Sequence, residues 1–573
     1  MNALTFSTAI YSGRVQSVTL RQRSLSVARL RVLLVAALFT ALAFAAVVRI
    51  AFLGLTDATH SATSFAEALL PPRGEITDRN GQPLARAFPA FALWYNPDAL
   101  GEGSSLVKSP KEVALELKAI FPDMDETELA DRLAKGKAGY LRRRVLPEDA
   151  NRVQAIGELA LELPQETDRH YPQGSMGAHV LGYVGADGRG RVGMEAVLDK
   201  QLRDPATRGT PSALSIDVRV QGALEDELYR GMRATNALGG AGIVLDVDTG
   251  EVIALASLPS FDPNKIDSAG AQLMFNRVTN QVYELGSTFK PLAVAAAIDA
   301  GTITDFGHRY SARPFPIGKF TIKDSHDLGA SLNTPEMLMH SSNVVTGHIV
   351  KDLGPRRLKQ TMVDLGMNAR PEIELPARGF PLWHAGEWPL ITAVTVGYGH
   401  GISVTPLHLA SAYAAMVNGG VYRPATMRKL SANDVPKGRR VFKASTSARM
   451  NQLLRMIAVY GTGRKADAPG FRVGGKTGSA DKPSGGGYNR TSVVATFAAA
   501  FPMDGPRYVV IAMLDEPKGT VASSFQRTAA WNAAPVVGRL VPRIGPMLGV
   551  NPDSTRDVDL TDLAPLVPKG AKE

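Results

Sequence analysis

The sequence predicts an α+β fold that follows a single membrane-spanning helix. Two apolar runs on either side of an Asp- and Gly-containing loop, within residues 242–256, predict a β-hairpin. Helical patterns then fill about residues 290–420, and β-rich runs return at 470–480, 493–501 and 507–515. Strands that resume after a helical insertion are expected to complete one sheet, which is the arrangement of the α+β class.

Length and composition limit what the chain can be. With 573 residues, of which 45% are hydrophobic and 21% charged, it is expected to form two or three globular domains. It has no cysteine, which excludes disulfide bonds, thiolate metal sites and a cysteine nucleophile. The net charge of +10 does not indicate nucleic-acid binding, because half of it lies in residues 1–60 and no nucleic-acid motif accompanies it.

Residues 32–55 are predicted to anchor the chain in a membrane as one helix, because the apolar run is long enough to cross a bilayer. Residues 1–31 carry five arginines and no acidic residue, so they are expected to stay in the cytoplasm. The rest of the chain would then lie in the periplasm of a cell with an inner membrane. A cleaved signal peptide with its site at Ala41-Leu42-Ala43 is the alternative, but the run is longer than a signal core and contains that site.

Residues 56–213 are predicted to form a domain without catalytic chemistry. Asn80-Gly81 is a strong hairpin turn between two extended runs. Residues 110–165 have an amphipathic helical pattern, in which Asp125 would cap one helix. The cluster Arg142-Arg143-Arg144 is interpreted as a solvated face.

Residues 214–550 are predicted to form a second domain, and residues 551–573 a disordered tail, since the tail is polar and contains proline. A helix from Val220 to Met232 would precede the first hairpin, and Thr405-Pro406 would begin another helix as N-cap and first residue. Three histidines are expected to be core or loop residues rather than ligands: His179, His340 and His400.

The segment from Glu284 to Pro291 carries the first candidate catalytic pair. Ser287 is expected at the start of a helix of about three turns, where a serine usually only caps the helix. Lys290 would share a helix face with Ser287 because residues three apart are neighbours. A serine hydroxyl needs a base to act as a nucleophile, and a lysine can be that base if burial lowers its pKa. Ser-x-x-Lys alone arises by chance in most chains of this length.

Two further motifs give this pair its significance. Ser341-Ser342-Asn343 follows an apolar stretch in a position that suits a helix junction. Lys476-Thr477-Gly478 lies in a Gly-rich run that predicts a strand, where an extended peptide could be added at a sheet edge. The three motifs in this order are typical of penicillin-binding proteins and serine β-lactamases.

With these motifs and the segment from Pro71 to Ala85, the chain resembles the class B penicillin-binding proteins over about residues 32–545. The resemblance implies a non-catalytic pedestal of the dimerisation type over residues 56–213. It also implies a penicillin-binding transpeptidase domain, with the serine β-lactamase/transpeptidase fold, over residues 214–550. Leu285 departs from the family pattern, in which proline is usual at this position.

The resemblance implies roles for the residues on the helical side of the site. Ser287 would be acylated by the substrate, and Lys290 would be the base for that step. Ser341 would relay a proton to the leaving amine. Asn343 would hold a substrate amide, since its side chain both donates and accepts hydrogen bonds.

The strand would supply the other half of the site. Lys476 would contribute positive charge, to orient the relay serine and to attract a carboxylate. Thr477 and Ser479, on either side of Gly478, would donate hydroxyl hydrogen bonds to that carboxylate. The backbone N–H groups of Ser287 and Ser479 would form the oxyanion hole, in which one donor contributes roughly 3–4 kcal/mol.

The activity implied is D,D-transpeptidation, which crosslinks peptidoglycan stem peptides and is inhibited by β-lactams, with no metal or organic cofactor. Expected partners are the lipid-linked precursor polymer, a membrane glycosyltransferase and other division proteins. The moderate length, the lean pedestal and the run from Leu514 to Lys518 resemble the division-specific branch of the family, which acts at the septum.

Three alternatives remain open. One is the elongation-specific branch of the same family. Another is a membrane-tethered β-lactamase or carboxypeptidase, although such enzymes are typically shorter and need a water-activating base that the sequence does not reveal. The third is a non-catalytic division scaffold or antibiotic sensor, which the intact motifs disfavour.

Overall fold

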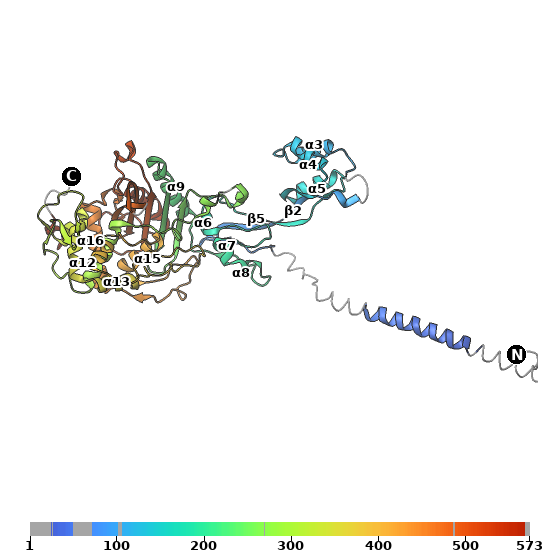
Figure 1. Cartoon of the computed structure of the whole chain (residues 1–573), viewed down its shortest axis with the longest axis horizontal. Helices are drawn as coiled ribbons and strands as arrows, with labels where there is room; N and C mark the ends of the chain where they lie inside the picture. The colour runs from blue at the N-terminus through green and yellow to red at the C-terminus, as the bar shows by residue number, and fades with distance from the viewer. Residues whose placement is uncertain are drawn as a thin grey trace, which may run out of the picture. The chain divides into compact units, whose positions relative to one another are not determined.

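The computed structural model describes residues 25, 27–49, 71–100, 106–268, 270–484 and 487–567 (Figure 1). Contacts divide the chain into two units, residues 1–70 and 71–573. Parts of all five predicted segments lie outside the described residues: most of the cytoplasmic tail, the anchor after Arg49, residues 56–70 and 101–105 of the pedestal, residues 269 and 485–486 of the second domain, and the tail after Val567.

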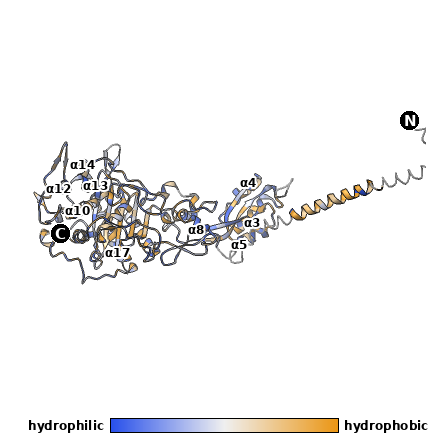
Figure 2. Cartoon of the chain, turned by 90° about the horizontal axis from the view of Figure 1, so that it is seen from below, coloured by the Kyte–Doolittle hydropathy of each residue, from blue (hydrophilic) through white to orange (hydrophobic). Residues whose placement is uncertain are grey.

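In the first unit, Val27–Arg49 form one helix, which is hydrophobic along its length (Figure 2). Its length and composition allow it to cross a membrane, as predicted, although it begins at Val27 rather than Val32. Thr40 donates its hydroxyl to the Ala36 carbonyl at 2.8 Å, so this polar group is satisfied within the helix.

The second unit begins with a sheet of order β3-β2-β1-β6, in which β4 and β5 also pair with β2. Its strands are β1 (Ile76–Thr77), β2 (Pro83–Tyr95), β3 (Gly139–Val145), β4 (Leu161–Glu162), β5 (Gln165–His170) and β6 (Ser212–Ala213). Three helices pack against β2 and β3 around an apolar core: α3 (Pro110–Ile120), α4 (Glu126–Ala134) and α5 (Pro147–Ala155). The Asn80-Gly81 turn joins β1 to β2 as predicted, with Gly81 at a φ of 82°.

The helical prediction for residues 110–165 is wrong over β3. This segment pairs antiparallel with the long strand β2, and alternate residues Leu141 and Val145 are buried in the core. Pairing with a strand distant in sequence therefore overrides the local helical pattern. The arginine cluster on β3 is also more than a solvated face, because Arg142 forms an ion pair with Asp123 at 2.8 Å.

A buried ionic cluster joins the start of the unit to later segments. Both oxygens of Glu195 are paired, one with Arg73 at 2.7 Å and the other with Arg169 at 2.6 Å. Three short helices carry or follow these groups: α6 (Ala178–Leu181), α7 (Gly193–Val197) and α8 (Asp199–Arg203). Nearby, buried Asp78 accepts a hydrogen bond from the backbone N–H of Val218 at 3.1 Å, which ties the pedestal segment to the next domain.

A five-stranded antiparallel sheet of order β15-β16-β17-β7-β8 forms the centre of the remaining fold. Its strands are β7 (Gly239–Asp246), β8 (Val252–Leu258), β15 (Gly474–Ser484), β16 (Gly487–Phe501) and β17 (Tyr508–Asp515). The two early strands and three late ones belong to one sheet, so the α+β prediction is confirmed.

Both faces of this sheet are covered by helices. On one face lie α9 (Val218–Thr235) and α17 (Ala533–Ile544), and on the other α10 (Lys290–Asp299), α15 (Pro406–Val417) and α16 (Ala444–Tyr460). Neighbouring strand residues such as Ile243 and Val244 belong to different apolar cores, since successive side chains point to opposite faces. The predicted cap holds: the Thr405 side chain accepts the backbone N–H of His408 at the start of α15.

The segment between β8 and β15 is mostly helical, as predicted, and includes α11 (Thr334–His340), α12 (Asn343–Leu353), α13 (Pro355–Asp364) and α14 (Leu390–Gly397). Short strand pairs interrupt it: β9 (Tyr310–Ser311) with β12 (Ser331–Leu332), and β10 (Phe315–Ile317) with β11 (Phe320–Ile322). Gly318, at a φ of 59°, makes the turn between β10 and β11, a local signal that the helical interpretation overlooked.

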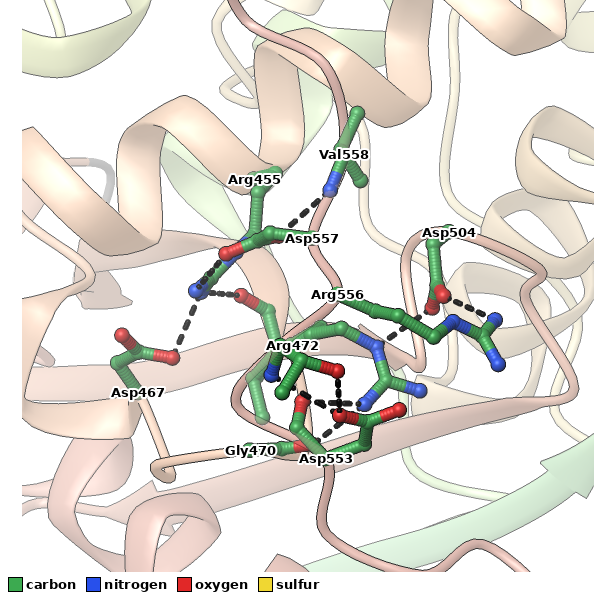
Figure 3. Close-up of polar contacts among 11 residues, drawn as sticks. Arg455, Asp467, Gly470, Arg472, Asp504, Asp553, Arg556, Asp557 and Val558 are labelled. Carbon is green, nitrogen blue, oxygen red and sulfur yellow. Dashed lines mark hydrogen bonds and ion pairs between the residues drawn. The ribbon is translucent and has the colours of Figure 1, made fainter.

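Residues 551–567, called here the C-terminal segment, differ from the predicted disorder because they pack against the domain. Figure 3 shows Arg455 of α16 between two carboxylates, Asp557 at 2.6 Å and Asp467 at 2.7 Å. Leu563 is buried in the larger apolar core. Charged side chains that find fixed partners thus order a segment whose composition alone suggests a solvated chain.

Candidate active site

Ser287 lies in a tight turn, Gly286–Phe289, that leads directly into α10. The turn is held from several sides: Gly286 donates its N–H to the Gly399 carbonyl at 3.1 Å, and Tyr413 donates its hydroxyl to the Thr288 carbonyl at 2.7 Å. Gly286 has a φ of 56°, a conformation that glycine adopts without strain. The flanking residues are buried while Ser287 remains partly exposed, as a nucleophile must be.

Lys290, Ser341 and Lys476 come together although they are far apart in sequence. The Nζ atoms of both lysines donate to the Ser341 hydroxyl, each at 3.0 Å. Lys290 Nζ also donates to the Ser341 carbonyl. Ser341 occupies the junction between α11 and α12 with a φ of 62°, as the C-cap of α11. Ser341 thus lies at a helix junction and Lys476 on a strand, as the sequence predicts for these two motifs.

Burial controls the charge state of the two lysines. Desolvation lowers the pKa of Lys290 well below its ordinary value, the Lys476 charge lowers this pKa further, and Asp324 opposes the shift. Burial alone lowers the pKa of Lys476 to about 7. Since two adjacent ammonium groups repel each other, the arrangement favours a neutral Lys290 beside a protonated Lys476.

The sequence predicts that Ser287 and Lys290 contact each other directly, but the structure pairs Lys290 with another residue. Among the described residues, the Ser287 hydroxyl has no hydrogen-bond partner, and Lys290 is instead bonded to Ser341. Helix geometry still places Lys290 one turn after Ser287. Catalytic hydrogen bonds often tighten only when substrate is bound, so this geometry is compatible with a base at Lys290.

Asp324 supports the second motif, and sequence reasoning missed it. Its carboxylate accepts the Ser342 hydroxyl at 2.6 Å and the Asn343 backbone N–H at 2.5 Å, at the start of α12. The backbone of Asn343, the first residue of α12, is thereby held in place, and the residue is partly exposed. A carboxylate at a helix N-terminus is stabilising, but no local pattern connects Asp324, in the loop after β11, to α12.

On β15, the motif Lys476-Thr477-Gly478 and the following Ser479 run beside the nucleophile turn. The Thr477 hydroxyl is 2.9 Å from that of Thr462, and Ser479 accepts the backbone N–H of Ala529 at 2.9 Å, which leaves the Ser479 proton available to a ligand. Gly478 allows the strand to approach the turn: a Cβ atom there would lie 2.2 Å from the Leu285 carbonyl oxygen. Ser479 also lines a cavity of about 420 Å³.

Together these groups can supply a partly exposed hydroxyl, a neutral amine, a relay hydroxyl and a buried ammonium. That set suits acyl transfer through a covalent serine intermediate. Among the described residues, no group of three or more His, Cys, Asp or Glu side chains is arranged to hold a metal ion.

Two family models match this chain. The family model for the penicillin binding protein transpeptidase domain matches residues 240–537, and that for the penicillin-binding protein dimerisation domain matches residues 68–229. A probable peptidoglycan D,D-transpeptidase FtsI from Caulobacter vibrioides is 38% identical over 85% of this chain and 83% of that protein. Peptidoglycan D,D-transpeptidase FtsI from Escherichia coli is 29% identical over 84% of each.

A solved structure also resembles this one. Penicillin binding protein 3 from Mycobacterium tuberculosis, complexed with aztreonam, superposes with a TM-score of 0.66 and 25% identity, covering 84% of this chain and 98% of that chain. The similarity therefore extends over the pedestal segment as well as the sheet and its helices.

Proposed function

The chain belongs to the class B penicillin-binding proteins, and on that premise we propose that it is a peptidoglycan D,D-transpeptidase that works through an acyl-enzyme on Ser287. The observation that carries this proposal is the convergence of Lys290 and Lys476 on the Ser341 hydroxyl at 3.0 Å each, beside the turn in which Ser287 is partly exposed. The family membership and the names of the relatives support the reaction class.

The first half-reaction follows from the charge states. Neutral Lys290 takes the proton of the Ser287 hydroxyl while its oxygen attacks the carbonyl of the penultimate D-alanine of a stem peptide. The backbone N–H groups of Ser287 and Ser479 stabilise the resulting oxyanion. The C–N bond then breaks, and the leaving D-alanine nitrogen receives a proton through Ser341.

The strand side binds the substrate. Lys476 carries positive charge near the terminal carboxylate, and Thr477 and Ser479 donate hydroxyl hydrogen bonds to it, while Gly478 lets the peptide backbone lie close to the strand. Asn343 holds a backbone amide of the donor peptide. An amine from a neighbouring stem peptide then attacks the acyl-enzyme, which forms the crosslink and releases Ser287. A β-lactam would acylate the same serine.

The protein is membrane-anchored, as its apolar helix and its relatives indicate. We further propose that residues 1–31 face the cytoplasm and that both domains, over 56–213 and 214–550, lie in the periplasm, because arginines dominate the segment before the helix. The FtsI names of the relatives favour a role at the division septum, with a membrane glycosyltransferase and division proteins as partners.

Intact-mass spectrometry of the full chain in detergent, incubated with benzylpenicillin, tests the proposal. We expect a long-lived adduct of one penicillin on the native protein and none on Ser287→Ala. Complete absence of an adduct on the native protein would contradict the proposed nucleophile. An adduct that disappears within seconds while penicilloate accumulates would instead identify a β-lactamase.

A further inference from the structure

A cavity next to Ser479 contains charged groups that the steps above do not use. Its lining residues are His400, Ser479, Asp481, Val493, Phe525, Gln526, Arg527 and Thr528. Glu284, three residues before Ser287, is 8% exposed, and its charge acts on the His400 imidazole. The cavity therefore adjoins the strand that would bind the donor peptide, and Gly399, next to His400, accepts the N–H of Gly286 in the nucleophile turn.

Two buried polar atoms here lack partners among the described residues. One oxygen of Glu284 accepts the Gly401 N–H at 2.9 Å and the Tyr488 hydroxyl at 3.2 Å, but the other has no hydrogen bond. Nδ1 of His400 also has none. Leaving a buried acceptor unsatisfied is costly, so such atoms call for an explanation, such as a ligand that supplies the missing donor.

The charges around the cavity favour a cation. Glu284 and Asp481 contribute two carboxylates, and the rings of Tyr398 and Tyr488 lie 5.6 and 5.9 Å from the His400 ring. Aromatic faces attract ammonium groups. One cationic side chain, Arg527, opposes this, and its guanidinium donates to the Thr491 carbonyl at 3.0 Å. Lys290 also acts on His400, but the site favours its neutral form.

We propose that this cavity holds the attacking amine of the second stem peptide, with Asp481 binding it as an ammonium, the nearby charge of Glu284 favouring that ammonium, and His400 removing its first proton. The inference rests on the proposed transpeptidase function and assigns its acceptor site. The cavity lies against Ser479, whose N–H would hold the acyl carbonyl, so an amine bound there is close to the carbon that it must attack.

In this step every proton and electron pair has a donor and an acceptor. The ammonium transfers one proton to the His400 ring, and the freed lone pair forms a C–N bond with the acyl carbonyl. The C–O bond to Ser287 breaks and its electron pair stays on the serine oxygen. The second proton of the nitrogen passes through Lys290 to that oxygen, and His400 releases its proton to solvent.

The environment of His400 suits a proton acceptor. Burial lowers the pKa of this imidazole, the Glu284 carboxylate raises it, Lys290 lowers it, and Asp481 raises it. Tyr398 and Tyr488 also face the ring, and burial raises the pKa of each phenol to about 12, so they stay neutral. The imidazole is therefore uncharged near neutral pH and free to take a proton.

The test measures how the acyl-enzyme divides between amine and water. The full chain in detergent is given a D-alanyl thioester donor with D-alanine as a small, soluble acceptor amine. The ratio of aminolysis to hydrolysis is measured from pH 6 to pH 10 for native protein, His400→Gln and Asp481→Asn. His308→Gln, which alters an exposed histidine outside the cavity lining, is the matched control.

We expect His400→Gln to lower the ratio about tenfold near pH 7, with recovery toward pH 10, where the amine is already unprotonated. Asp481→Asn should raise the D-alanine concentration needed for half-maximal aminolysis, at all pH values below 9. A merely structural role of His400 would not produce the pH-dependent recovery. Equal ratios in native protein and His400→Gln at every pH would overturn the inference, whereas absence of any acyl-enzyme would overturn the proposed function itself.

Discussion

Lys290 and Lys476 bring two amines to one hydroxyl in the protein interior, where only one of them can carry charge at low cost. Burial of an ammonium normally requires a paired carboxylate. Here the nearest acid, Asp324, is engaged with the start of α12. The pair therefore divides the proposed roles: Lys290, whose pKa is lowered well below its ordinary value, would be the base, and Lys476 would retain the positive charge.

This division predicts the pH dependence of acylation. Acylation needs neutral Lys290, so its rate constant should rise with pH through the lowered pKa of that residue. It also needs protonated Lys476, so the rate constant should fall as pH passes the pKa of Lys476, about 7 in the free enzyme. Stopped-flow measurement of benzylpenicillin acylation between pH 5 and 10 should give a bell-shaped curve. A rate that only rises across this range would contradict the role given to Lys476.

Gly478 is expected to be needed for the close approach of β15 to the nucleophile turn. In Gly478→Ala, the new Cβ would meet the Leu285 carbonyl oxygen at 2.2 Å and push the strand away from Ser287. A displacement of about 1 Å can reduce the rate roughly 100-fold, so acylation should fall by about that factor while the protein stays folded. Gly505→Ala, where nothing lies within 4 Å of the new atom, should acylate at the native rate.

At this scale the sequence predicted a group of residues but not their contacts. Ser287, Lys290, Ser341 and Lys476 could be found because the three motifs are short and occur in a recognisable order. Asp324 could not, because its partners lie on α12 and no periodic pattern marks it. His400 was expected to be a loop or core residue, and its position beside the cavity depends on a turn packed against Gly286.

Among the elements, the C-terminal segment connects two parts of the site. Arg455 binds Asp557 of this segment and also donates to the Val473 carbonyl, just before β15. The Leu566 carbonyl accepts the side-chain N–H of Asn333, the N-cap of α11. Helix α11 leads to Ser341, and β15 carries Lys476. The C-terminal segment therefore supports α11 at its start and β15 at the residue before it.

Asp557→Asn should therefore destabilise the protein more than an ordinary surface substitution. It removes half of the charge opposite Arg455, which is 8% exposed, and we expect a loss of about 1–2 kcal/mol in the free energy of unfolding. Asp562→Asn breaks a more exposed ion pair with Arg449 and should change stability by less than about 1 kcal/mol. Thermal unfolding of the full chain in detergent distinguishes the two, and equal effects would contradict the role of the segment.

Element prediction succeeded where the signal is local. The turn at Asn80-Gly81, the caps at Asp125 and Thr405, and the strands of the central sheet all occur as expected. It failed for β3 and for the C-terminal segment, whose partners are remote. Both segments are polar and have only a weak local pattern. Pairing with β2 fixes the conformation of β3, and the ion pair with α16 holds the C-terminal segment.

On the scale of the whole molecule, Asp78 makes the pedestal segment and the following domain depend on each other. Its carboxylate accepts N–H groups from Asn80 at 2.7 Å, Gln82 at 2.8 Å and Val218 at 3.1 Å, and it is fully buried. The first two bonds shape the hairpin turn, and the third holds the start of α9. One side chain thus stabilises both parts.

Asp78→Asn should lower the unfolding temperature of the full chain as a single transition. An amide in this position would turn N–H groups toward backbone donors, and we expect a loss of about 2–4 kcal/mol. Calorimetry in detergent, together with the half-life of penicillin binding at 37 °C, measures the effect on both parts. Asp98→Asn, at an exposed position, is the control, and two separate transitions in Asp78→Asn would refute the coupling.

The order of strands in the central sheet also has a consequence for how the protein is made. β7 emerges early in synthesis, but the strand that pairs with its inner edge, β17, follows only after the whole helical segment, since Asp246 is opposite Tyr508. Until then the β7–β8 hairpin presents an open apolar edge, which is a template for aggregation. Non-local pairing of this kind also folds slowly. Nascent chains that stall before residue 508 should therefore depend on chaperones, or be degraded, more than the completed protein.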